Sequence, residues 1–381
     1  MERLTIGFDA KRIVRNGTGL GSYGRTLVND LSCNENLDLR LYVPDLGREN
    51  LRSQVPERDN VHYVLPLRAK NNISKALWRT YGIKKQLVGD GVRLFHGLSG
   101  ELPAGIRKTG IRTVVTIHDL IFLRHPEYYH WWDVQIYRRK FLQTLRNADR
   151  IVAISECTRR DIAELGHIPE ERIDLIYQSC APRFSADVSP EEVGRVAQKY
   201  GLPARYILGV GSIEERKNML LALKALPLLP DDIHLVLVGR ATPYTERIQA
   251  WAAQNRLQNR LHLLHGVPDA DLPAVYAGAK VFVYPSRYEG FGIPIIEAIN
   301  MRLPVVACTG SCLEEAGGPH NIYVHPDDVE AMAAAVKTWL GNEEQRQRRI
   351  DSSRQYIQRF ANTNAAEQFA DLYFELSKYP K

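Results

Sequence analysis

Short apolar runs alternate with longer amphipathic stretches along the whole chain. The first half predicts strands at LTIGFDA, LDLRLYV, VHYVLPL, RLFHG, RTVVTIHD and RIVAIS, and the second half at YILGVG, HLVLVG, LHLLHG, VFVYP and PVVA. Helical periodicity places helices near 23–31, 74–88, 131–145, 157–165, 218–226, 245–255 and 272–277. Strands alternating with helices are typical of parallel sheets. Each half therefore predicts its own doubly wound α/β domain.

The two predicted domains are joined by a segment without periodicity. Residues 183–191 are rich in Pro, Ser and acids, which is typical of a linker. They separate an N-terminal domain, 1–182, from a C-terminal domain, 192–358. In the last segment, 359–381, residues 364–376 predict a helix with no following strand, which can pack back on the first domain. Since doubly wound sheets bind ligands at the carboxyl ends of their strands, we expect the chemistry in loops after strands.

Length and charge agree with this division. A chain of 381 residues exceeds the ~250–300 residues at which single cores stop growing. Residues 51–150 hold 18 basic and 8 acidic side chains. This excess favours contact with an anionic acceptor or membrane surface. Its cations include Arg68, Lys70, Lys75, Arg79, Lys84 and Lys85. Nucleic acid is not an expected partner, because the second half is not basic and no recognition motif occurs.

The cysteines and the N-terminal segment indicate in which cellular compartment the protein is expected. Five scattered cysteines without a CxxC pair indicate neither a disulfide framework nor a zinc site, and favour reducing cytoplasm. The N-terminus lacks an apolar run of signal-peptide length, and no window approaches the ~20 apolar residues that span a bilayer. We therefore expect a cytoplasmic protein whose membrane contact, if any, is peripheral and at the inner face.

The densest chemical signal is PSRYEGFGIPIIE, residues 285–297, with glutamates at Glu289 and Glu297. Glycines between them let backbone amides approach a ligand, and helix N-terminal amides bind phosphates or hydroxyls. A helix beginning near Pro294 puts Glu289 in the preceding loop and Glu297 about one turn inside. The two carboxylates can then accept hydrogen bonds from two separate polyols. A helix cap plus a solvated acid is the alternative interpretation.

Two further polar groups follow predicted strands. Arg216 and Lys217 come after YILGVG, where adjacent cations can neutralise a departing diphosphate. Alternatively, they are two surface cations on a first helical turn. His118 and Asp119 end the predicted strand VVTIHD, and ligand-binding residues in such a sheet usually lie at the carboxyl ends of strands. A purely structural histidine is the alternative there.

These features, in their order, resemble the retaining glycosyltransferase family 4. The landmarks are GLGSY at 19–23, His118-Asp119, Arg216-Lys217-Asn218, Gly266-Val267 and the E-x7-E motif of Glu289 and Glu297. The resemblance covers nearly the whole chain, more weakly before residue 110. It implies the GT-B fold, with two Rossmann-like domains facing a central cleft. It makes 1–182 the acceptor side and 192–358 the nucleotide-sugar side.

The resemblance also implies roles for individual residues. Glu289 faces the donor sugar hydroxyls, Glu297 holds the nucleotide ribose, and Arg216 and Lys217 bind the donor diphosphate. His118 hydrogen bonds a sugar hydroxyl, while Asp119 fixes its loop. Backbone groups of two segments complete the donor site: the flexible glycine loop with Gly19, Leu20 and Gly21, whose amides close over the phosphates, and Gly290, Phe291, Gly292 and Ile293, which cradle the sugar.

The implied activity is transfer of a hexose from a nucleotide diphosphate sugar, with retention, to a saccharide or lipid-linked saccharide in surface polysaccharide synthesis. The leaving phosphate assists deprotonation of the acceptor, so no protein nucleophile is needed. The stretches HDLIFLRHPEYY and EGFGIPIIEA look most like mannosyltransferase-type members that use GDP-mannose. Closely similar motifs accept UDP-sugars, so the donor stays open. No cofactor and no obligatory metal are expected.

Other interpretations stay open beside this one. Gly19–Gly24 matches the G-x-G-x-x-G of NAD-dependent oxidoreductases, although residues 11–18 intervene after the strand. A non-catalytic subunit that binds nucleotide-sugar is a second alternative. Asp269-Ala270-Asp271 is a possible metal-binding D-x-D, but its place before a predicted helix favours capping. The aromatics at 128–132 suit sugar stacking, a membrane interface or the core equally well.

Overall fold

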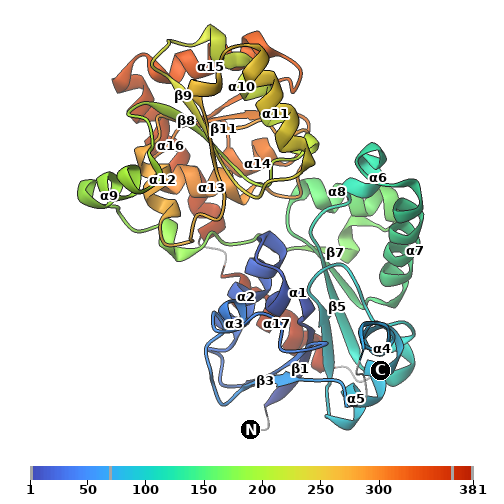
Figure 1. Ribbon diagram of the computed structural model, residues 1–381. Helices are drawn as coiled ribbons and strands as arrows, with labels where there is room; N and C mark the ends of the chain where they lie inside the picture. Colours follow the sequence, from blue (N-terminus) through green and yellow to red (C-terminus); the bar gives the residue numbers. More distant parts are fainter. Residues whose placement is uncertain (1–2, 68–70, 362–363, 379–381) are drawn as a thin grey trace. The chain divides into compact units, whose positions relative to one another are not determined.

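The computed structural model describes residues 3–67, 71–361 and 364–378 and divides the chain into two compact units. The first comprises residues 1–178 and 363–381, and the second comprises 179–362. Each unit has one parallel sheet flanked by helices (Figure 1). Two parallel-sheet α/β domains of this kind make the GT-B architecture.

The sheet of the first unit has seven parallel strands in the order β3-β2-β1-β4-β5-β6-β7. They are β1 Leu4–Asp9, β2 Leu37–Tyr42, β3 Val61–Val64, β4 Leu94–Gly97, β5 Arg112–Ile117, β6 Arg150–Ala153 and β7 Ile173–Leu175. Six of them lie on the predicted runs. The sequence missed β7, because a strand of three residues with a central aspartate has too little apolar pattern to be recognised.

The helices of this unit follow the strands that they connect. They are α1 Lys11–Arg15, α2 Gly19–Leu31, α3 Glu49–Arg52, α4 Asn72–Leu77, α5 Ile83–Gly89, α6 Ile121–Arg124, α7 Trp131–Asn147 and α8 Glu156–Gly166. A π-helical turn, Trp78–Gly82, interrupts the predicted helix 74–88 between α4 and α5. Such turns are rare and frequently lie at functional sites.

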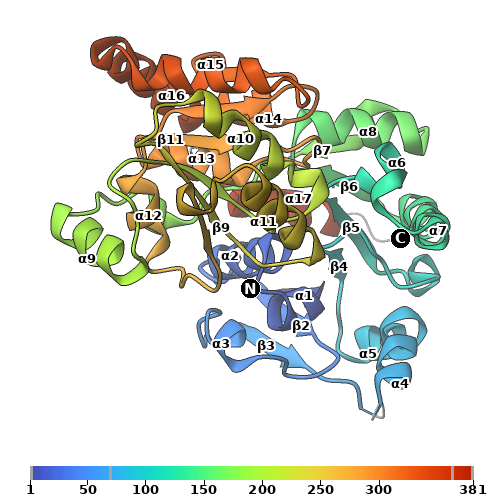
Figure 2. The ribbon, with the colours of Figure 1, turned by 45° about the horizontal axis from the view of Figure 1, so that its top comes forward.

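The last helix, α17 Ala365–Ser377, packs on the first unit beside α2 and β4 (Figure 1, Figure 2). Its Phe369 and Tyr373 are completely buried in the core that includes β1. The Tyr373 hydroxyl lies 2.6 Å from His96 Nδ1, and His96 Nε2 lies 2.8 Å from Thr116 Oγ1. The C-terminal segment thus completes the core of the N-terminal unit.

The sheet of the second unit has six parallel strands in the order β10-β9-β8-β11-β12-β13. They are β8 Tyr206–Val210, β9 His234–Val238, β10 Leu261–Leu264, β11 Val281–Tyr284, β12 Val305–Cys308 and β13 Ile322–Val324. The central strands read as continuous apolar runs because helices cover both faces of a parallel sheet. The strand order reverses between β8 and β11, which is where such sheets bind ligands beyond the carboxyl ends.

The helices of the second unit are α9 Pro190–Tyr200, α10 Met219–Ala225, α11 Pro243–Gln254, α12 Leu272–Gly278, α13 Ile293–Asn300, α14 Leu313–Gly317, α15 Val329–Leu340 and α16 Glu343–Ala361. Two boundaries differ from the sequence interpretation. The units divide at Gln178 and Ser179, and the expected linker ends in α9, where the Ser189 side chain accepts a hydrogen bond from the Glu192 amide. Helix α16 also extends beyond residue 359, whereas the last helix, Ala365–Ser377, lies where the sequence predicts it.

Candidate active site

A buried cluster of opposite charges lies at the carboxyl ends of β8 and β11. Lys217 ends a short 3-10 turn after β8, and Glu289 lies in the loop after β11. Because these strands are neighbours in the sheet, the two side chains meet, with Lys217 Nζ 2.5 Å from Glu289 Oε1. Arg216 Nη1 lies 3.0 Å from the same oxygen. Glu289 and Lys217 are only 8% and 9% exposed, so water screens this pair little.

Neighbouring hydroxyls hold the Glu289 carboxylate in place. Ser286 Oγ donates to Oε1 at 2.6 Å, and the Tyr284 hydroxyl donates to it at 3.2 Å. Lys217 Nζ also donates to the Tyr284 hydroxyl at 2.6 Å. Arg216 is fixed separately, by the Tyr288 carbonyl at 2.5 Å and the Glu214 carboxylate at 2.7 Å. Within the described residues, the bonds to the Glu289 carboxylate end on Oε1, so Oε2 keeps its capacity to accept from a ligand.

The cations decide the protonation state of Glu289. Burial alone would raise the pKa of this carboxyl, but Lys217 and Arg216 outweigh burial and lower the pKa to about 2. Glu289 is therefore ionised throughout the neutral range. The sequence interpretation had assigned Glu289 to the sugar and the two cations to the diphosphate. The structure brings all three together, so a bound diphosphate would share its cations with Glu289.

The glycine-containing segment after Glu289 is a turn anchored by packing. Gly292 has φ +99°, a conformation that side chains rarely adopt, and precedes α13 as its N-cap. Pro294 lies in the first turn of α13, as the sequence predicts. The ring of Phe291 is 3% exposed and packs edge-on against Phe360, with 5.2 Å between centroids. Its side chain anchors the turn, which leaves any contact with a sugar to the backbone.

Glu297 lies inside α13 in a different environment. The hydroxyl of Tyr276, from α12, donates to Glu297 Oε2 at 2.8 Å. Burial raises the pKa of Glu297 to about 7, although this hydrogen bond and the charge of Arg183 oppose the rise. The two motif glutamates therefore differ at neutral pH: Glu289 is fully charged, whereas Glu297 is close to its midpoint.

His118, in the first unit, has partners for both ring nitrogens. Nε2 donates to the Leu98 carbonyl at 2.8 Å, so Nδ1 accepts from the Gln178 side-chain amide at 2.9 Å. Burial lowers the pKa of His118 to about 4, so the imidazole is neutral. A sugar hydroxyl at Nδ1 would have to replace Gln178. Asp119 accepts from the Ile121 amide at 3.2 Å, in agreement with a role in fixing its loop.

The predicted flexible loop at Gly19–Gly24 is wrong: these residues form the first turns of α2. Thr18 is the N-cap, and its carbonyl accepts hydrogen bonds from the Gly21 and Ser22 amides, both at 3.0 Å. A Cβ at Gly21 would lie 1.8 Å from the Asn16 carbonyl oxygen, so this glycine serves close backbone packing. Helix α1 separates the glycines from β1, unlike the tight turn of a dinucleotide fingerprint. Gly19 and Leu20 keep first-turn amides that α-helical bonding leaves unused.

The D-x-D string has structural partners. Asp271 occupies the N-cap position of α12, but its carboxylate accepts from Lys199 and Tyr200 of α9, each at 2.6 Å, instead of capping as expected. Asp269 pairs with Arg183 at 3.5 Å. Among the described residues, no three His, Cys, Asp or Glu side chains gather as a metal site.

The basic stretch of the first unit is largely tied to its own neighbours. Lys75 pairs with Asp45 at 3.0 Å, and the Lys84 ammonium donates to the Ala104 carbonyl at 2.6 Å. Arg79 is also paired, whereas Lys85 is exposed. Arg68 and Lys70 lie outside the described residues. Three of the six cations thus have partners within their own unit, and the contact with an anionic acceptor or membrane stays a prediction.

The aromatic segment before and within α7 is a surface feature. Trp131 and Trp132 are 62% and 72% exposed, so the core interpretation of these rings is wrong. In the part of the chain that the structure describes, no helix combines the length and apolarity needed to cross a bilayer.

The sequence interpretation missed several partners of these residues. Tyr284, Ser286 and Tyr276 support the two glutamates, and Gln178 binds His118. Tyr284 and Ser286 flank the motif and could have been suspected from their place at a strand end. Tyr276 and Gln178 reach their partners only through the tertiary fold.

Comparison with known proteins places both units in one class. The family model "Glycosyltransferase Family 4" matches residues 19–179, and "Glycosyl transferases group 1" matches residues 195–356. O-antigen chain mannosyltransferase B of Escherichia coli is 33% identical over 248 residues, or 64% of each chain. A GDP-mannose-dependent alpha-(1-6)-phosphatidylinositol monomannoside mannosyltransferase of Mycolicibacterium smegmatis is 28% identical over 256 residues, 62% of this chain and 63% of its own. The match thus spans less than two thirds of either relative.

Solved structures share the fold over a larger part of the chain. The structure of Anabaena HepE in complex with UDP and glucose has a TM-score of 0.76, with 17% identity, over 98% of this chain and 100% of its own. At that identity the likeness concerns the fold.

Proposed function

The chain belongs to the family 4 glycosyltransferases, and from this premise we propose that it transfers a hexose from a nucleoside diphosphate sugar to a saccharide or lipid-linked saccharide in surface polysaccharide synthesis. The names of its Escherichia coli and Mycolicibacterium relatives favour mannose and GDP-mannose. The UDP and glucose of the HepE complex keep a UDP-sugar as the competing donor. The observation that carries the proposal is the buried cluster of Arg216, Lys217 and Glu289 beyond β8 and β11.

The donor diphosphate binds Arg216 and Lys217, which neutralise the negative charge that grows on the leaving group. Cations placed where charge develops are usually a major source of catalysis in a site that excludes water. Glu289 holds both cations through Oε1 and offers Oε2 to the hydroxyls of the donor sugar. Glu297 accepts from the ribose hydroxyls. The amides of the turn at 290–293 hold the sugar, and those of Gly19 and Leu20 approach the phosphates.

The reaction proceeds with retention and without a protein nucleophile. The bond from the sugar C1 to the phosphate oxygen breaks, and the bond from C1 to the acceptor oxygen forms on the same face. The acceptor hydroxyl proton passes to the leaving phosphate. Positioning of the two substrates and charge stabilisation supply the acceleration. His118, which is neutral, contributes a hydrogen bond at Nδ1 once Gln178 has moved aside.

The same cations make a divalent metal unnecessary in this proposal. The acids of the D-x-D string, moreover, are engaged by Arg183, Lys199 and Tyr200. We expect full turnover in excess chelator. Loss of turnover in EDTA that Mg²⁺ or Mn²⁺ restores would contradict the metal-independent mechanism.

A thermal-shift panel of GDP, UDP, ADP and their sugars tests the donor, because a ligand that binds the folded state raises its melting temperature. We expect one base to stabilise the protein selectively, with GDP favoured. NMR of the product formed from the matching sugar nucleotide then reports the anomeric configuration. Binding of NAD alone would support an oxidoreductase instead. Donor binding without transfer or slow donor hydrolysis would support a non-catalytic subunit.

A peripheral contact with anionic membrane forms part of this proposal. The exposed Trp131 and Trp132 stand at the start of α7, whose exposed Arg138 and Arg139 follow within two turns. Aromatic rings with nearby cations suit the headgroup region. We expect Trp131→Ala with Trp132→Ala to reduce flotation with anionic vesicles. Unchanged flotation, or none by the unmodified protein, would remove the membrane from the proposal.

A further inference from the structure

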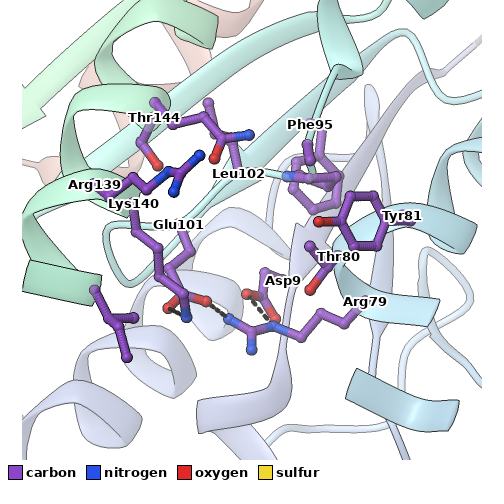
Figure 3. Close-up of a pocket in the computed structure, with 14 residues that line it drawn as sticks. Asp9, Arg79, Thr80, Tyr81, Phe95, Glu101, Leu102, Arg139, Lys140 and Thr144 are labelled. Carbon is purple, nitrogen blue, oxygen red and sulfur yellow. Dashed lines mark hydrogen bonds and ion pairs between the residues drawn. The ribbon is translucent and has the colours of Figure 1, made fainter. Parts of the chain in front are cut away.

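Two cavities adjoin in the first unit. One, of about 280 Å³, is lined by His118 and Leu20 from the candidate site. The second, of about 240 Å³, opens among the π-helical turn at 78–82, the segment after β4 and helix α7 (Figure 3). Glu101 and Lys140 line both cavities. The two cavities are therefore neighbours, and a ligand with one ring in each would contact Glu101 and Lys140 between them.

Ion pairs build the wall that the cavities share. Arg79, from the π-helical turn, bonds Asp9 at the end of β1 at 2.9 Å and also pairs with Glu101 (Figure 3). Lys140 Nζ lies 3.2 Å from Glu101 Oε1. Although burial opposes it, Arg79 and Lys140 hold the pKa of Glu101 below its ordinary value. Glu101 is thus an ionised acceptor, fixed by cations from two different elements.

The remaining lining offers the groups that a neutral sugar needs. Thr80, Tyr81 and Gln143 supply hydroxyls and an amide, while Phe95, Leu102 and Pro103 supply apolar surface. A pyranose ring has hydroxyls around its edge and C–H groups on its faces, so it uses both kinds of wall. The volume lies below the ~300 Å³ at which pockets for drug-sized ligands begin, which fits one ring. The two carboxylates, Asp9 and Glu101, are paired with Arg79 and Lys140, and Arg139 also lines this cavity.

The second cavity also has an outer exit. Tyr81, Arg139 and Gln143 line both this cavity and a further surface hollow along α7. Tyr81 is 59% exposed at this position. A saccharide chain that occupies the second cavity can therefore continue to solvent.

We propose that the second cavity is a subsite for the sugar that precedes the acceptor sugar, so that the protein recognises two consecutive sugars of an acceptor saccharide. This inference rests on the proposed glycosyl transfer and names its acceptor: an oligosaccharide whose last sugar enters the His118 cavity. Glu101 and Arg79 position the wall, and Tyr81 and Gln143 contact the preceding sugar.

The test compares one-sugar and two-sugar acceptors. Tyr81→Ala and Gln143→Ala change exposed side chains, so the fold should tolerate them. With the donor that the nucleotide panel identifies, transfer is measured to methyl α-mannoside and to the α1→2, α1→3 and α1→6 methyl mannobiosides. We expect each variant to lose roughly three- to tenfold in kcat/KM for the preferred disaccharide, as for one lost hydrogen bond or ring contact. The monosaccharide and donor hydrolysis should be unaffected. Gln198→Ala, an exposed glutamine of α9, is the matched control.

A binding measurement keeps the inference independent of turnover. Saturation-transfer NMR of the mannobiosides, cellobiose, lactose and chitobiose should show at least one bound disaccharide, with signals from both rings that weaken in Tyr81→Ala. Equal losses for one-sugar and two-sugar acceptors, unchanged kinetics in both variants, or no bound disaccharide would overturn the subsite. Absence of donor binding and of any transfer would instead count against the proposed function. The two failures are thus distinguishable.

Discussion

Glu289 and Glu297, at the two ends of one short segment, show how the surroundings of two identical side chains give them different pKa values. Glu289 receives Lys217 and Arg216 at the edge of the sheet, and its pKa falls to about 2. Glu297, eight positions later inside α13, has the Tyr276 hydroxyl and no comparable cation cluster within the described residues, and its pKa rises to about 7. The first carboxylate is a fixed charge, and the second is a group whose charge a ligand can change.

This difference has a consequence for catalysis. A fixed charge at Glu289 holds Arg216 and Lys217, the cations that we propose for the diphosphate, in one geometry. In the proposed role of Glu297, the ionised carboxylate binds ribose hydroxyls more tightly than the protonated carboxyl does, because its hydrogen bonds are charge-assisted. Nucleotide affinity should therefore depend on pH through Glu297, while the arrangement of Arg216 and Lys217 should not.

The largest expected effect on stability and turnover comes from Glu289, the glutamate that is fully charged. Glu289→Ala leaves Lys217 buried without its carboxylate and Arg216 with the Glu214 carboxylate alone, and removal of one partner of a buried pair costs about 3–5 kcal/mol. We expect the free energy of unfolding in urea to fall by that amount and turnover to fall at least 100-fold. Glu289→Gln, which keeps the shape, serves as the comparison. A variant Glu289→Ala with normal stability and turnover would show that the pair is unimportant.

The second effect concerns Glu297 and pH. Its pKa of about 7 in the free protein exceeds the ordinary glutamate value of ~4.3, so below pH 7 the carboxyl is mostly protonated. Since ribose hydroxyls bind the ionised form, nucleotide affinity should fall as pH drops below 7, approaching tenfold per pH unit. Calorimetry in buffers of different ionisation enthalpy should detect proton release near pH 7. Glu297→Gln should abolish the release; persistence of the release would assign it to another group.

The smallest expected effect comes from removing one hydroxyl beside each glutamate, that of Tyr276 beside Glu297 and that of Ser286 beside Glu289. Tyr276→Phe removes the hydrogen bond that lowers the pKa of Glu297, so the midpoint of the affinity profile should move to higher pH. Ser286→Ala removes a hydrogen bond from Glu289, whose pKa lies too far below neutrality for the profile to move. Each should reduce stability by about 1 kcal/mol. Identical pH profiles for the two variants would contradict the assignment of the pH dependence to Glu297 alone.

Periodicity and motif spacing predicted most of the fold and the parts of the site that follow strands. The apolar runs are long enough to mark eleven of the strands, whereas β7 and β13 have three residues each and escaped notice. Lys217 and Glu289 could be assigned to one site because both follow strands. Their direct pairing could not, because it depends on β8 and β11 being neighbours.

The errors have physical causes of the same kind. Gly19–Gly24 suggested a loop, but Thr18 starts a helix there and Gly21 allows the backbone of Asn16 to approach. Asp271 occupies a capping position, yet cations and a hydroxyl from α9 draw its carboxylate away. Cations counted along residues 51–150 gave a surplus, whereas Lys75 and Arg79 are neutralised by acids distant in sequence. In each case the deciding partner is a tertiary contact.

The most direct test of the central claim, that Lys217 and Arg216 form a diphosphate site organised by Glu289, compares a nucleotide with its nucleoside. Calorimetry would measure GDP and guanosine, or the pair for the base that the panel selects, with the unmodified protein, Lys217→Ala and the exposed control Lys337→Ala. We predict that Lys217→Ala weakens the diphosphate at least tenfold and leaves the nucleoside and the control unchanged. Equal affinities of the unmodified protein and Lys217→Ala for the diphosphate would contradict the claim.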